Sequence, residues 1–384
     1  FFSCGCTQYY TNPKFLKDDI KQIKPVVMAT VPRLWEAIHD GFYLALKKMP
    51  VKKQKLLKIL IRNSSIFKIN LRKIKNLDRT YINTISKIPM LISVGFRFLP
   101  HKLASLFIWP SILEQLCGEK LKFPINGGGA LPEHVDLFFE SLGVDVLVGY
   151  GLTETSPVIT CRKRKLNVRG SSGQPLAFTE IKITNEEKTK ILNFREIGKI
   201  LVRGPQVMKG YLNNAKATKE VLTDNGWFDT GDLGFLIPNG SLFITGRAKD
   251  TIVLTSGENI EPNPLETAIL SSEMINQVQL VGQDKKTLTA LVVPNLEFVR
   301  SKFLEEDLAN LNNDKKIRSF FKFQINSLLK KRVGSRYEEQ ILDCYFVDAF
   351  TLDNGLLTQT LKQKRREIEK LYSSQIEEMY TKQI

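Results

Sequence analysis

Residues 148–157 read VGYGLTETSP, and this stretch decides the fold that we expect. It follows the apolar run VDVL at residues 144–147, which is of the kind that forms a buried strand. The two glycines of the stretch let the backbone approach a flat or anionic group closely. Thr153, Glu154 and Thr155 then supply two hydroxyls and one carboxylate. This set suits Mg²⁺ bridging phosphate oxygens, since that ion takes one or two carboxylates plus substrate phosphates. A plain strand-to-helix turn capped by a threonine is the alternative.

Length and composition predict a protein of two or more domains. The chain has 384 residues, of which 42% are hydrophobic, so it can bury a sizeable core. It begins with Phe1 rather than Met, and we expect a fragment of a longer chain. No uninterrupted apolar run reaches the length of about 18 residues that indicates a membrane-spanning helix. The five cysteines are scattered, which indicates a reducing compartment rather than a disulfide framework.

The histidines argue against one class of chemistry. The chain has three, and all lie outside the motifs described below: His39, His101 and His134. Histidine-based acid–base catalysis and a histidine-ligated metal are therefore not expected.

The positive charge of the chain is concentrated in one segment. The net charge is +16, but residues 47–102 hold fifteen lysines and arginines against one acidic residue, whereas residues 250–384 hold eighteen basic and twenty acidic residues. Between residues 47 and 113 the lysines alternate with Leu, Ile and Phe, a pattern typical of an amphipathic segment that lies in a membrane interface and attracts anionic lipid. We therefore predict peripheral membrane attachment through this basic amphipathic insertion. A helical insertion with a solvated lysine face is the alternative. No nucleic-acid partner is expected, because aromatic residues for base stacking are sparse in the segment.

Residues 121–201 alternate short apolar runs with helical patterns. The run FPIN at residues 123–126 precedes a glycine-rich loop, an amphipathic helix follows, and the next strand leads into residues 148–157. This βαβ rhythm predicts a parallel sheet with ligands at the carboxyl ends of its strands.

The flanking regions predict further elements. Residues 24–41 indicate a strand, a proline turn and a helix that begins near Pro32, with Trp35 as a packing residue. Residues 197–211 and 240–255 indicate shorter strands, which we expect to be antiparallel. The end of the chain indicates a few strands and two or three helices, the last of them a charged helix that begins at Lys362.

Polar residues in further turns suit a nucleotide. The loop Gly127-Gly128-Gly129-Ala130 allows close approach to a planar ring or a phosphate, although a tight loop is the alternative. Asp232 can accept hydrogen bonds from sugar hydroxyls, and Arg247 can donate a planar fork to hydroxyls or phosphate. Lys249 lies in a polar break between two apolar runs, which indicates an inter-domain hinge. Lys362 could lie beside a transferring phosphoryl group, with a solvated helix face as the alternative.

Taken together and in this order, these stretches resemble the adenylate-forming (AMP-binding) enzymes that activate carboxylic acids. The resemblance runs from Cys6 to Met379. It is closest to the long-chain acyl-CoA synthetases and, within them, to the acyl–acyl-carrier-protein synthetases of cyanobacteria and plastids. The motifs that point to this subgroup are VPRLWE at 31–36, GYGLTETSP at 149–157, VRGPQVM at 202–208, GRAKDTIV at 246–253 and NGLLTQT at 354–360.

The resemblance implies an α/β fold in two domains. Residues 1–248 would form part of a large N-terminal adenylation domain of mixed sheets and helices, and residues 249–384 a small, mobile α+β lid domain. Lys249 would be the hinge between them. The family carries a lysine-ended phosphate loop rich in Ser, Thr and Gly upstream of these motifs, and this sequence has none. We therefore expect that the N-terminal part of the large domain is missing from it.

The resemblance also implies a nucleotide site. The adenine pocket would be lined by Gly128, Gly129 and Ala130. The adenine and the acyl carboxylate would be flanked by Gly149, Tyr150 and Gly151. The ribose hydroxyls would be held by Asp232 and Arg247.

The same resemblance implies the catalytic residues. Thr153 would contact the α-phosphate, and Glu154 would bind Mg²⁺. Lys362 would be the adenylation lysine that reaches the bridging oxygen and the carboxylate. It aligns with the family's lysine, whereas its neighbours Lys364 and Arg365 could be confused with it.

The implied function is activation of long-chain fatty acids with ATP in lipid metabolism. Acyl-AMP and pyrophosphate would form first, and the acyl group would then pass to a phosphopantetheine thiol of acyl-carrier protein or coenzyme A. The expected location is the cytoplasm or the plastid stroma, at a membrane surface. The alternatives are a long-chain fatty-acid ligase specific for coenzyme A and a non-catalytic, membrane-associated fragment.

Overall fold

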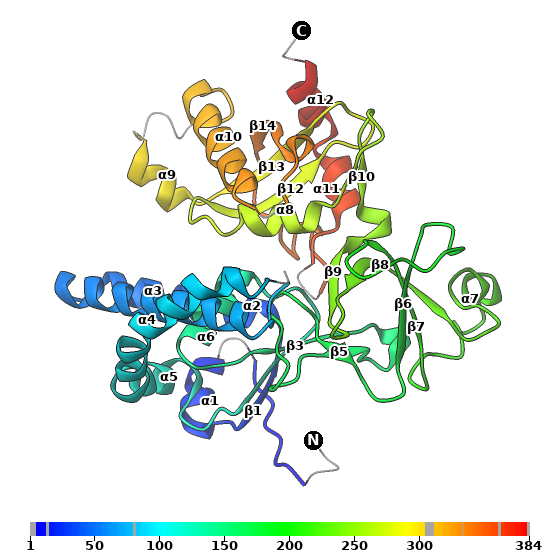
Figure 1. The fold of residues 1–384 in the computed structure, drawn as a ribbon. Helices are drawn as coiled ribbons and strands as arrows, with labels where there is room; N and C mark the ends of the chain where they lie inside the picture. Colours follow the sequence, from blue (N-terminus) through cyan, green and yellow to red (C-terminus); the bar gives the residue numbers. More distant parts are fainter. Residues whose placement is uncertain are drawn as a thin grey trace. The chain divides into compact units, whose positions relative to one another are not determined.

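The computed structural model describes residues 5–12, 15–79, 82–303, 311–332, 334–359 and 362–381. The chain forms two compact units, each considered by itself below: Phe1–Thr230 with Phe235–Ile244, and Gly231–Gly234 with Thr245–Ile384. Figure 1 shows the elements of both.

The first unit contains a five-stranded sheet in sequence order, with β1 (Val27–Thr30), β2 (Phe123–Asn126), β3 (Leu147–Tyr150), β4 (Thr160–Cys161) and β5 (Gln174–Pro175). The pairs β1–β2 and β2–β3 are parallel, as the βαβ rhythm predicts, and the pairs β3–β4 and β4–β5 are antiparallel.

The third strand begins later than predicted. Residues 144–146 lie outside the strand, which starts at Leu147 and includes Gly149 and Tyr150. The reason lies at the end of the preceding helix, where the backbone N–H of Val144 donates to the carbonyl of Phe139 at 2.9 Å. This bond ties the start of the apolar run to the helix, so the chain enters the sheet only afterwards.

Helices α1 (Leu16–Ile23), α2 (Pro32–Lys47) and α6 (Glu133–Ser141) accompany this sheet. Pro32 occupies the first turn of α2, as predicted, where its missing N–H costs nothing. Trp35 is fully buried, and its ring meets the ring of Phe139 edge-on at 4.8 Å between centroids. Its predicted packing role is confirmed.

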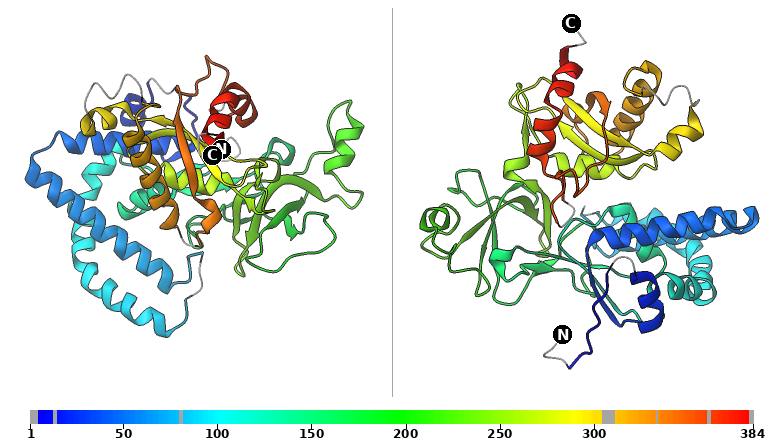
Figure 2. Two further views of the ribbon diagram at one scale, coloured as in Figure 1. Left: turned by 90° about the horizontal axis from the view of Figure 1, so that it is seen from above. Right: turned by 180° about the vertical axis from the view of Figure 1, so that it is seen from behind.

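The basic insertion forms a helical hairpin. Helices α3 (Val51–Ile74) and α4 (Ile88–Phe107) lie beside each other, and α5 (Trp109–Cys117) follows (Figures 1 and 2). Taken singly, no helix of the described residues is long and apolar enough to cross a membrane. By length and composition alone, Ile85–Phe107 and Trp109–Cys117 together would be long and apolar enough to cross one. The two helical segments are, however, bent by 53° against each other.

A second sheet has its strands in the order β6 (Glu180–Thr184), β7 (Gly198–Arg203), β8 (Phe228–Leu236) and β9 (Leu242–Arg247). It belongs to the first unit except for residues 231–234 of β8 and 245–247 of β9, which belong to the second unit. Helix α7 (Ala215–Val221) lies between β7 and β8 in the sequence. Strands β6 and β7 pair antiparallel, as expected for residues 197–211. Ile200 and Leu242 of this sheet share a core with Ile159, which precedes β4, and Tyr150 of β3 packs against it.

A buried ion cluster joins the hairpin to the first sheet. It comprises three cations and two carboxylates, namely Arg72, Arg162, Arg169, Asp136 and Glu140, all at most 7% exposed. Arg72 Nε lies 2.5 Å from Glu140 Oε1, and Arg162 Nη1 lies 2.7 Å from Asp136 Oδ2. Arg169 pairs with Glu140 as well.

The charges in this cluster hold Asp136 ionised. Burial by itself would raise the pKa of the Asp136 carboxyl, but the guanidinium groups of Arg162 and Arg169 outweigh burial, and the pKa lies below its usual value. The ionised Asp136 carboxylate therefore stabilises the fold at pH values above the pKa of an aspartate in the unfolded chain. This contribution is lost as the pH falls through the lower pKa that Asp136 has in the folded protein.

Replacing Arg72 by methionine should destabilise the first unit. The methionine keeps much of the apolar stem of Arg72 but leaves Glu140 with one buried cation fewer. Because removing one partner of a buried ion pair leaves a charge uncompensated, the free energy of unfolding should fall by about 3 kcal/mol. Urea unfolding measures the loss. The control is Lys24→Met, which breaks the exposed pair with Glu119 and should leave the midpoint unchanged. Equal midpoints for the two variants would show that the cluster does not support the fold.

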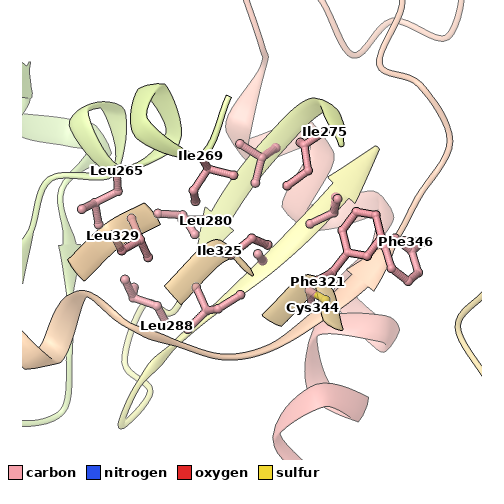
Figure 3. Packing of buried hydrophobic residues seen from close by; sticks show 14 of the residues in the cluster. Leu265, Ile269, Ile275, Leu280, Leu288, Phe321, Ile325, Leu329, Cys344 and Phe346 are labelled. Carbon is pink, nitrogen blue, oxygen red and sulfur yellow. The ribbon is translucent and has the colours of Figure 1, made fainter. Parts of the chain in front are cut away.

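The second unit is built on a three-stranded sheet of β12 (Ile275–Val281), β13 (Leu288–Pro294) and β14 (Ile341–Phe346), with a separate short pair β10 (Ile252–Val253) and β11 (Asn259–Ile260). Its helices are α8 (Pro262–Ile269), α9 (Leu296–Lys302), α10 (Lys315–Lys330), α11 (Arg365–Leu371) and α12 (Ser373–Thr381). Alternate residues of β13 enter two cores. Leu288 joins side chains of α8 and α10, among them Leu265 and Ile325 (Figure 3), whereas Leu291 packs with Ile368 of α11.

The predicted terminal helix begins three residues later than expected. We placed its start at Lys362, but α11 begins at Arg365, and a second helix follows. Leu357 and Gln363 form an isolated β-bridge, and the N–H of Lys364 donates to the carbonyl of Leu356 at 2.9 Å. The chain thus folds back on itself before the helix starts, and Lys362 lies in a loop.

Candidate active site

The carboxyl ends of three parallel strands bring loops together at one edge of the first sheet. The register aligns Thr30 with Asn126, and Asn126 with Val148. The N–H of Gly127 donates to the carbonyl of Thr30 at 3.0 Å, so the loop after β2 stays close to the start of α2. This edge is where open α/β sheets bind ligands.

The loop after β2 contains the predicted residues Gly128, Gly129 and Ala130. Gly128 has φ +77°, a conformation that L side chains rarely adopt, and a Cβ on Gly129 would lie 3.2 Å from Pro32 Cγ. The glycines thus let this loop turn tightly against the first turn of α2.

Asn126, which ends β2, was missed by sequence reasoning. Its side chain is fully buried, and its Nδ2 donates to the carbonyl of Gly129 at 3.4 Å. No partner for its Oδ1 occurs among the described residues. A buried acceptor without a partner costs about 1–3 kcal/mol, so Oδ1 is a candidate acceptor for a bound molecule. Its signal in the sequence is its position next to the triple glycine.

The loop after β3 leaves no space for a side chain at Gly151. A Cβ there would lie 1.6 Å from the carbonyl oxygen of Pro157. Gly149 lies within the strand, where a Cβ would be 3.5 Å from the carbonyl oxygen of Thr160. We predicted that the backbone approaches a ligand closely here. At Gly151 it instead approaches the protein's own backbone at Pro157, which folds residues 151–157 into a compact loop.

Thr153, Glu154 and Thr155 have different environments. Thr155 is fully buried, its Oγ1 accepts from the N–H of Leu152 at 3.0 Å, and it lies 3.1 Å from the carbonyl oxygen of Pro157. Thr155 thus holds the loop together, as in the alternative of a capped turn. Thr153 is exposed and Glu154 is half-buried, so these two side chains are available for binding.

Glu154 has a partner that sequence reasoning missed. The hydroxyl of Tyr211 donates to Glu154 Oε1 at 2.9 Å, and the N–H of Met208 donates to the Glu154 carbonyl at 2.8 Å. Burial, with the hydrogen bond and charge of Glu154, raises the pKa of Tyr211, so its hydroxyl stays protonated and donates. The sequence signal was the motif VRGPQVM, three residues before Tyr211.

In the second unit, the structure brings Asp232 and Arg247 together. Asp232 of β8 is 4% exposed, and its Oδ1 lies 3.0 Å from Nε of Arg247 at the end of β9. The Arg247 side chain is 40% exposed, so the guanidinium remains accessible. Lys249 is also exposed, in the 3₁₀ turn Ala248–Asp250.

The three cations at residues 362–365 have different roles. The Lys362 side chain is exposed, and its backbone is fixed by Thr358, whose N–H donates to the Lys362 carbonyl at 2.8 Å. Lys364 is exposed as well. Nη1 of Arg365 instead lies 2.7 and 2.9 Å from the two carboxylate oxygens of Glu266, and Nη2 donates to the carbonyl of Leu280 at 2.7 Å. Arg365 is therefore a structural residue, and the exposed lysines remain candidates for a substrate contact.

Among the described residues, no three His, Cys, Asp or Glu side chains come together as a metal site. A cation held by protein and substrate together requires only one or two carboxylates, and Glu154 supplies one at this sheet edge.

Glycine-lined loops at the ends of parallel strands, with a carboxylate in the neighbouring loop, are typical of nucleotide-binding α/β proteins. The chain belongs to the AMP-binding enzyme family. The model of this family matches residues 1–212, and the model of the AMP-binding enzyme C-terminal domain matches residues 249–314.

Two relatives from Arabidopsis thaliana match nearly the whole chain. The probable acyl-activating enzyme 16, chloroplastic, is 37% identical over 99% of this chain and 55% of its own length. A chloroplastic long-chain-fatty-acid–[acyl-carrier-protein] ligase is 36% identical over 99% of this chain and 53% of its own length. The chain thus spans about half the length of the curated relatives it matches.

A solved structure supports the fold. The A-PCP didomain of carboxylic acid reductase from Segniliparus rugosus, in complex with AMP, superposes with a TM-score of 0.64. The match covers 98% of this chain and 44% of that chain at 18% sequence identity.

Replacing Gly151 by alanine should weaken AMP binding by about 10–100-fold, because the added methyl group must displace the loop and a forced backbone shift costs about 1–3 kcal/mol. Isothermal titration calorimetry with AMP measures the effect. The matched control is Gly41→Ala in α2, where a Cβ meets nothing within 4 Å. Unchanged affinity in the Gly151 variant would mean that residues 151–157 do not contact the nucleotide.

Proposed function

We propose that the protein activates long-chain fatty acids with ATP and transfers them to a phosphopantetheine thiol. A fatty carboxylate attacks the α-phosphorus of ATP, the bond to the pyrophosphate leaving group breaks, and acyl-AMP forms. A thiol then attacks the carbonyl carbon of the mixed anhydride and releases AMP. The observation that carries this proposal is the loop 151–157 at the carboxyl end of β3, which presents Thr153 and Glu154 in a chain of the AMP-binding enzyme family.

The nucleotide would be bound mainly by backbone and by a few polar side chains. The adenine would lie against Gly128, Gly129 and Ala130 and beside the segment Gly149, Tyr150 and Gly151. Thr153 would donate to the α-phosphate. The Asp232 carboxylate and the Arg247 guanidinium, which already lie 3.0 Å apart, would hold the ribose hydroxyls.

Glu154 fits the role of the magnesium-binding residue. Its carboxylate is half-buried, and the described structure gives it one donor, the hydroxyl of Tyr211. A neutral donor fixes one oxygen and preserves the negative charge, as is usual around carboxylates that bind cations. When bound, Mg²⁺ would neutralise charge on the phosphates.

Lys362 would neutralise charge during the first step. It lies on the exposed loop before α11, and an ammonium beside the bridging oxygen and the carboxylate would stabilise the charge that develops there. Lys249 would serve as the hinge about which the lid domain of residues 249–384 moves. Such a movement would withdraw Lys362 once pyrophosphate has left and admit the thiol.

The names of the relatives support one choice of acceptor and of location. The name of one relative specifies an acyl-carrier protein as acceptor, and both relatives are chloroplastic, which supports a carrier protein and the plastid stroma here. Coenzyme A in the cytoplasm is the alternative, since both acceptors present the same thiol. A peripheral membrane surface completes the proposal, and a non-catalytic membrane-associated role is the remaining candidate.

Replacing Lys362 by alanine should slow acyl-AMP formation by about 10²–10³-fold, the usual cost of removing one charge-stabilising group. Fatty-acid-dependent exchange of pyrophosphate into ATP measures this step in the protein produced from its complete coding sequence. Thioester formation from added acyl-AMP should stay at the wild-type rate. Lys364→Ala, which removes a neighbouring exposed lysine, is the matched control. Equal losses in both half-reactions would contradict the role given to Lys362.

Removal of the hydroxyl in Tyr211→Phe should raise the Mg²⁺ concentration needed for half-maximal activity by about 10–100-fold, because residues that orient a metal-binding group contribute that much. A magnesium titration at fixed ATP measures the shift. Tyr337→Phe removes a hydroxyl from an 81% exposed tyrosine and should have no effect. An unchanged magnesium requirement would show that Tyr211 does not position Glu154.

A further inference from the structure

Helix α4 turns three of its polar side chains towards α3, whereas its Lys102 is exposed. Each of its polar residues next to α3 has a partner there, in the pairs Ser93 with Asn70 at 3.0 Å, Arg97 with Asn63 at 3.2 Å, and His101 with Ser64 at 2.9 Å. The first of these residues in α4, Ser93, pairs with the last of the partners in α3, Asn70, as in two antiparallel helices. The hydrogen bonds fix the rotation of α4 about its own axis, because they tie three successive turns to α3.

The opposite face of α4 is apolar and exposed. At helical spacing it presents side chains that are between 47% and 82% exposed, namely Leu91, Ile92, Phe96, Leu99, Leu103 and Leu106. A surface helix of a water-soluble protein has the reverse arrangement, with its apolar stripe against the core. A contiguous exposed apolar face of this kind marks an interaction surface.

The charge of the same hairpin selects the partner of this face. Helix α3 exposes Lys52, Lys53, Lys55 and Lys58, and α4 itself exposes Lys102. A second copy of the chain on this face would bring two strongly basic segments together. An anionic lipid surface satisfies both features, since acyl chains accept the apolar side chains and headgroup phosphates attract lysines.

The fold also keeps α4 from crossing a bilayer. The helix ends at Phe107, and α5 follows after a bend of 53°. Trp109 and Cys117 of α5 are buried in a core that also contains Trp35. The carboxyl end of α4 is thus anchored in the protein.

We propose that α4 lies in the plane of the membrane interface, with its apolar face among the acyl chains and the lysines of α3 among the headgroups of anionic lipids. The binding itself does not require the proposed reaction. Its use rests on the proposed function, since a long-chain fatty acid partitions into the same lipid surface.

Vesicle flotation without ATP or fatty acid tests the docking surface. The protein from its complete coding sequence should bind vesicles of phosphatidylcholine with phosphatidylglycerol at least about tenfold more tightly than phosphatidylcholine alone. The triple variant Leu91→Gln, Phe96→Gln, Leu99→Gln should lose binding to both. The matched control, Phe178→Gln with Leu212→Gln, removes side chains that are 87% and 91% exposed elsewhere and should bind normally. Equal binding by both variants overturns the proposal.

The lysines have their own test. Lys55→Gln with Lys58→Gln should reduce binding to anionic vesicles towards the level seen with phosphatidylcholine, because the electrostatic contribution is lost. Lys216→Gln with Lys219→Gln, two exposed lysines of α7, should change nothing. A loss of the same size in both double variants would mean that net charge rather than this surface attracts the protein.

A tryptophan at residue 96 reports the occupant directly. The Phe96→Trp variant adds one tryptophan to the three of this sequence, and its fluorescence is the difference from the wild-type spectrum. This added fluorescence should shift to the blue when vesicles are added, and brominated lipid should quench it. A blue-shifted signal before vesicles are added would show that protein covers the face, from this chain or a second copy, and would overturn the proposal. So would a signal that vesicles do not change.

Activity separates this proposal from the proposed function. The triple variant should keep wild-type ligase activity with a short, soluble fatty acid and lose activity with a long-chain acid supplied in vesicles. Vesicle binding without any ligase activity would contradict the proposed function alone. Ligase activity without vesicle binding would contradict the membrane proposal alone.

Discussion

The parallel pairing of β1, β2 and β3 is the constraint on which the first unit depends. Because the three strands run the same way, their carboxyl ends lie at one edge, and the glycine loop, the start of α2 and residues 151–157 converge there. The absence of a side chain at Gly151 then lets the loop after β3, residues 151–157, close on Pro157. This closure turns Thr155 inwards and leaves Glu154 to meet Tyr211.

The buried ion cluster connects this edge to the hairpin. Asp136 and Glu140 extend from α6, Arg72 comes from α3, and Arg162 directly follows β4, the strand paired with β3. Buried ion pairs are weak sources of net stability, since desolvation offsets much of their attraction. Their geometry is demanding, however, because each charge must find its partner. The cluster thus ties the carboxyl end of α3, the helix on which α4 packs, to α6.

The sequence predicted the elements whose signals are local. Pro32 marked the start of α2, and the apolar runs with intervening helical pattern marked the parallel strands. The start of β3 was wrong because a hydrogen bond from Val144 to the end of α6 decides it, and Lys362 was assigned to a helix that starts only after a bridge from Leu357. Tyr211 was missed because its contact joins segments distant in the sequence. The roles given to the nucleotide-binding residues and to Lys249 stay predictions.

The orientation of α4 shows the same limit of sequence patterns. Periodicity identifies an apolar and a polar face, and the usual assumption places the apolar face inwards. Here the polar side chains of α3, among them Asn63 and Asn70, reverse that assignment. The distribution of charge fits the consequence. Residues 47–102 carry almost all of the net positive charge, whereas residues 250–384 are nearly neutral. An anionic surface would attract the hairpin strongly and the second unit hardly at all. Attachment through α4 would therefore depend on the charge of the first unit and not on that of the second.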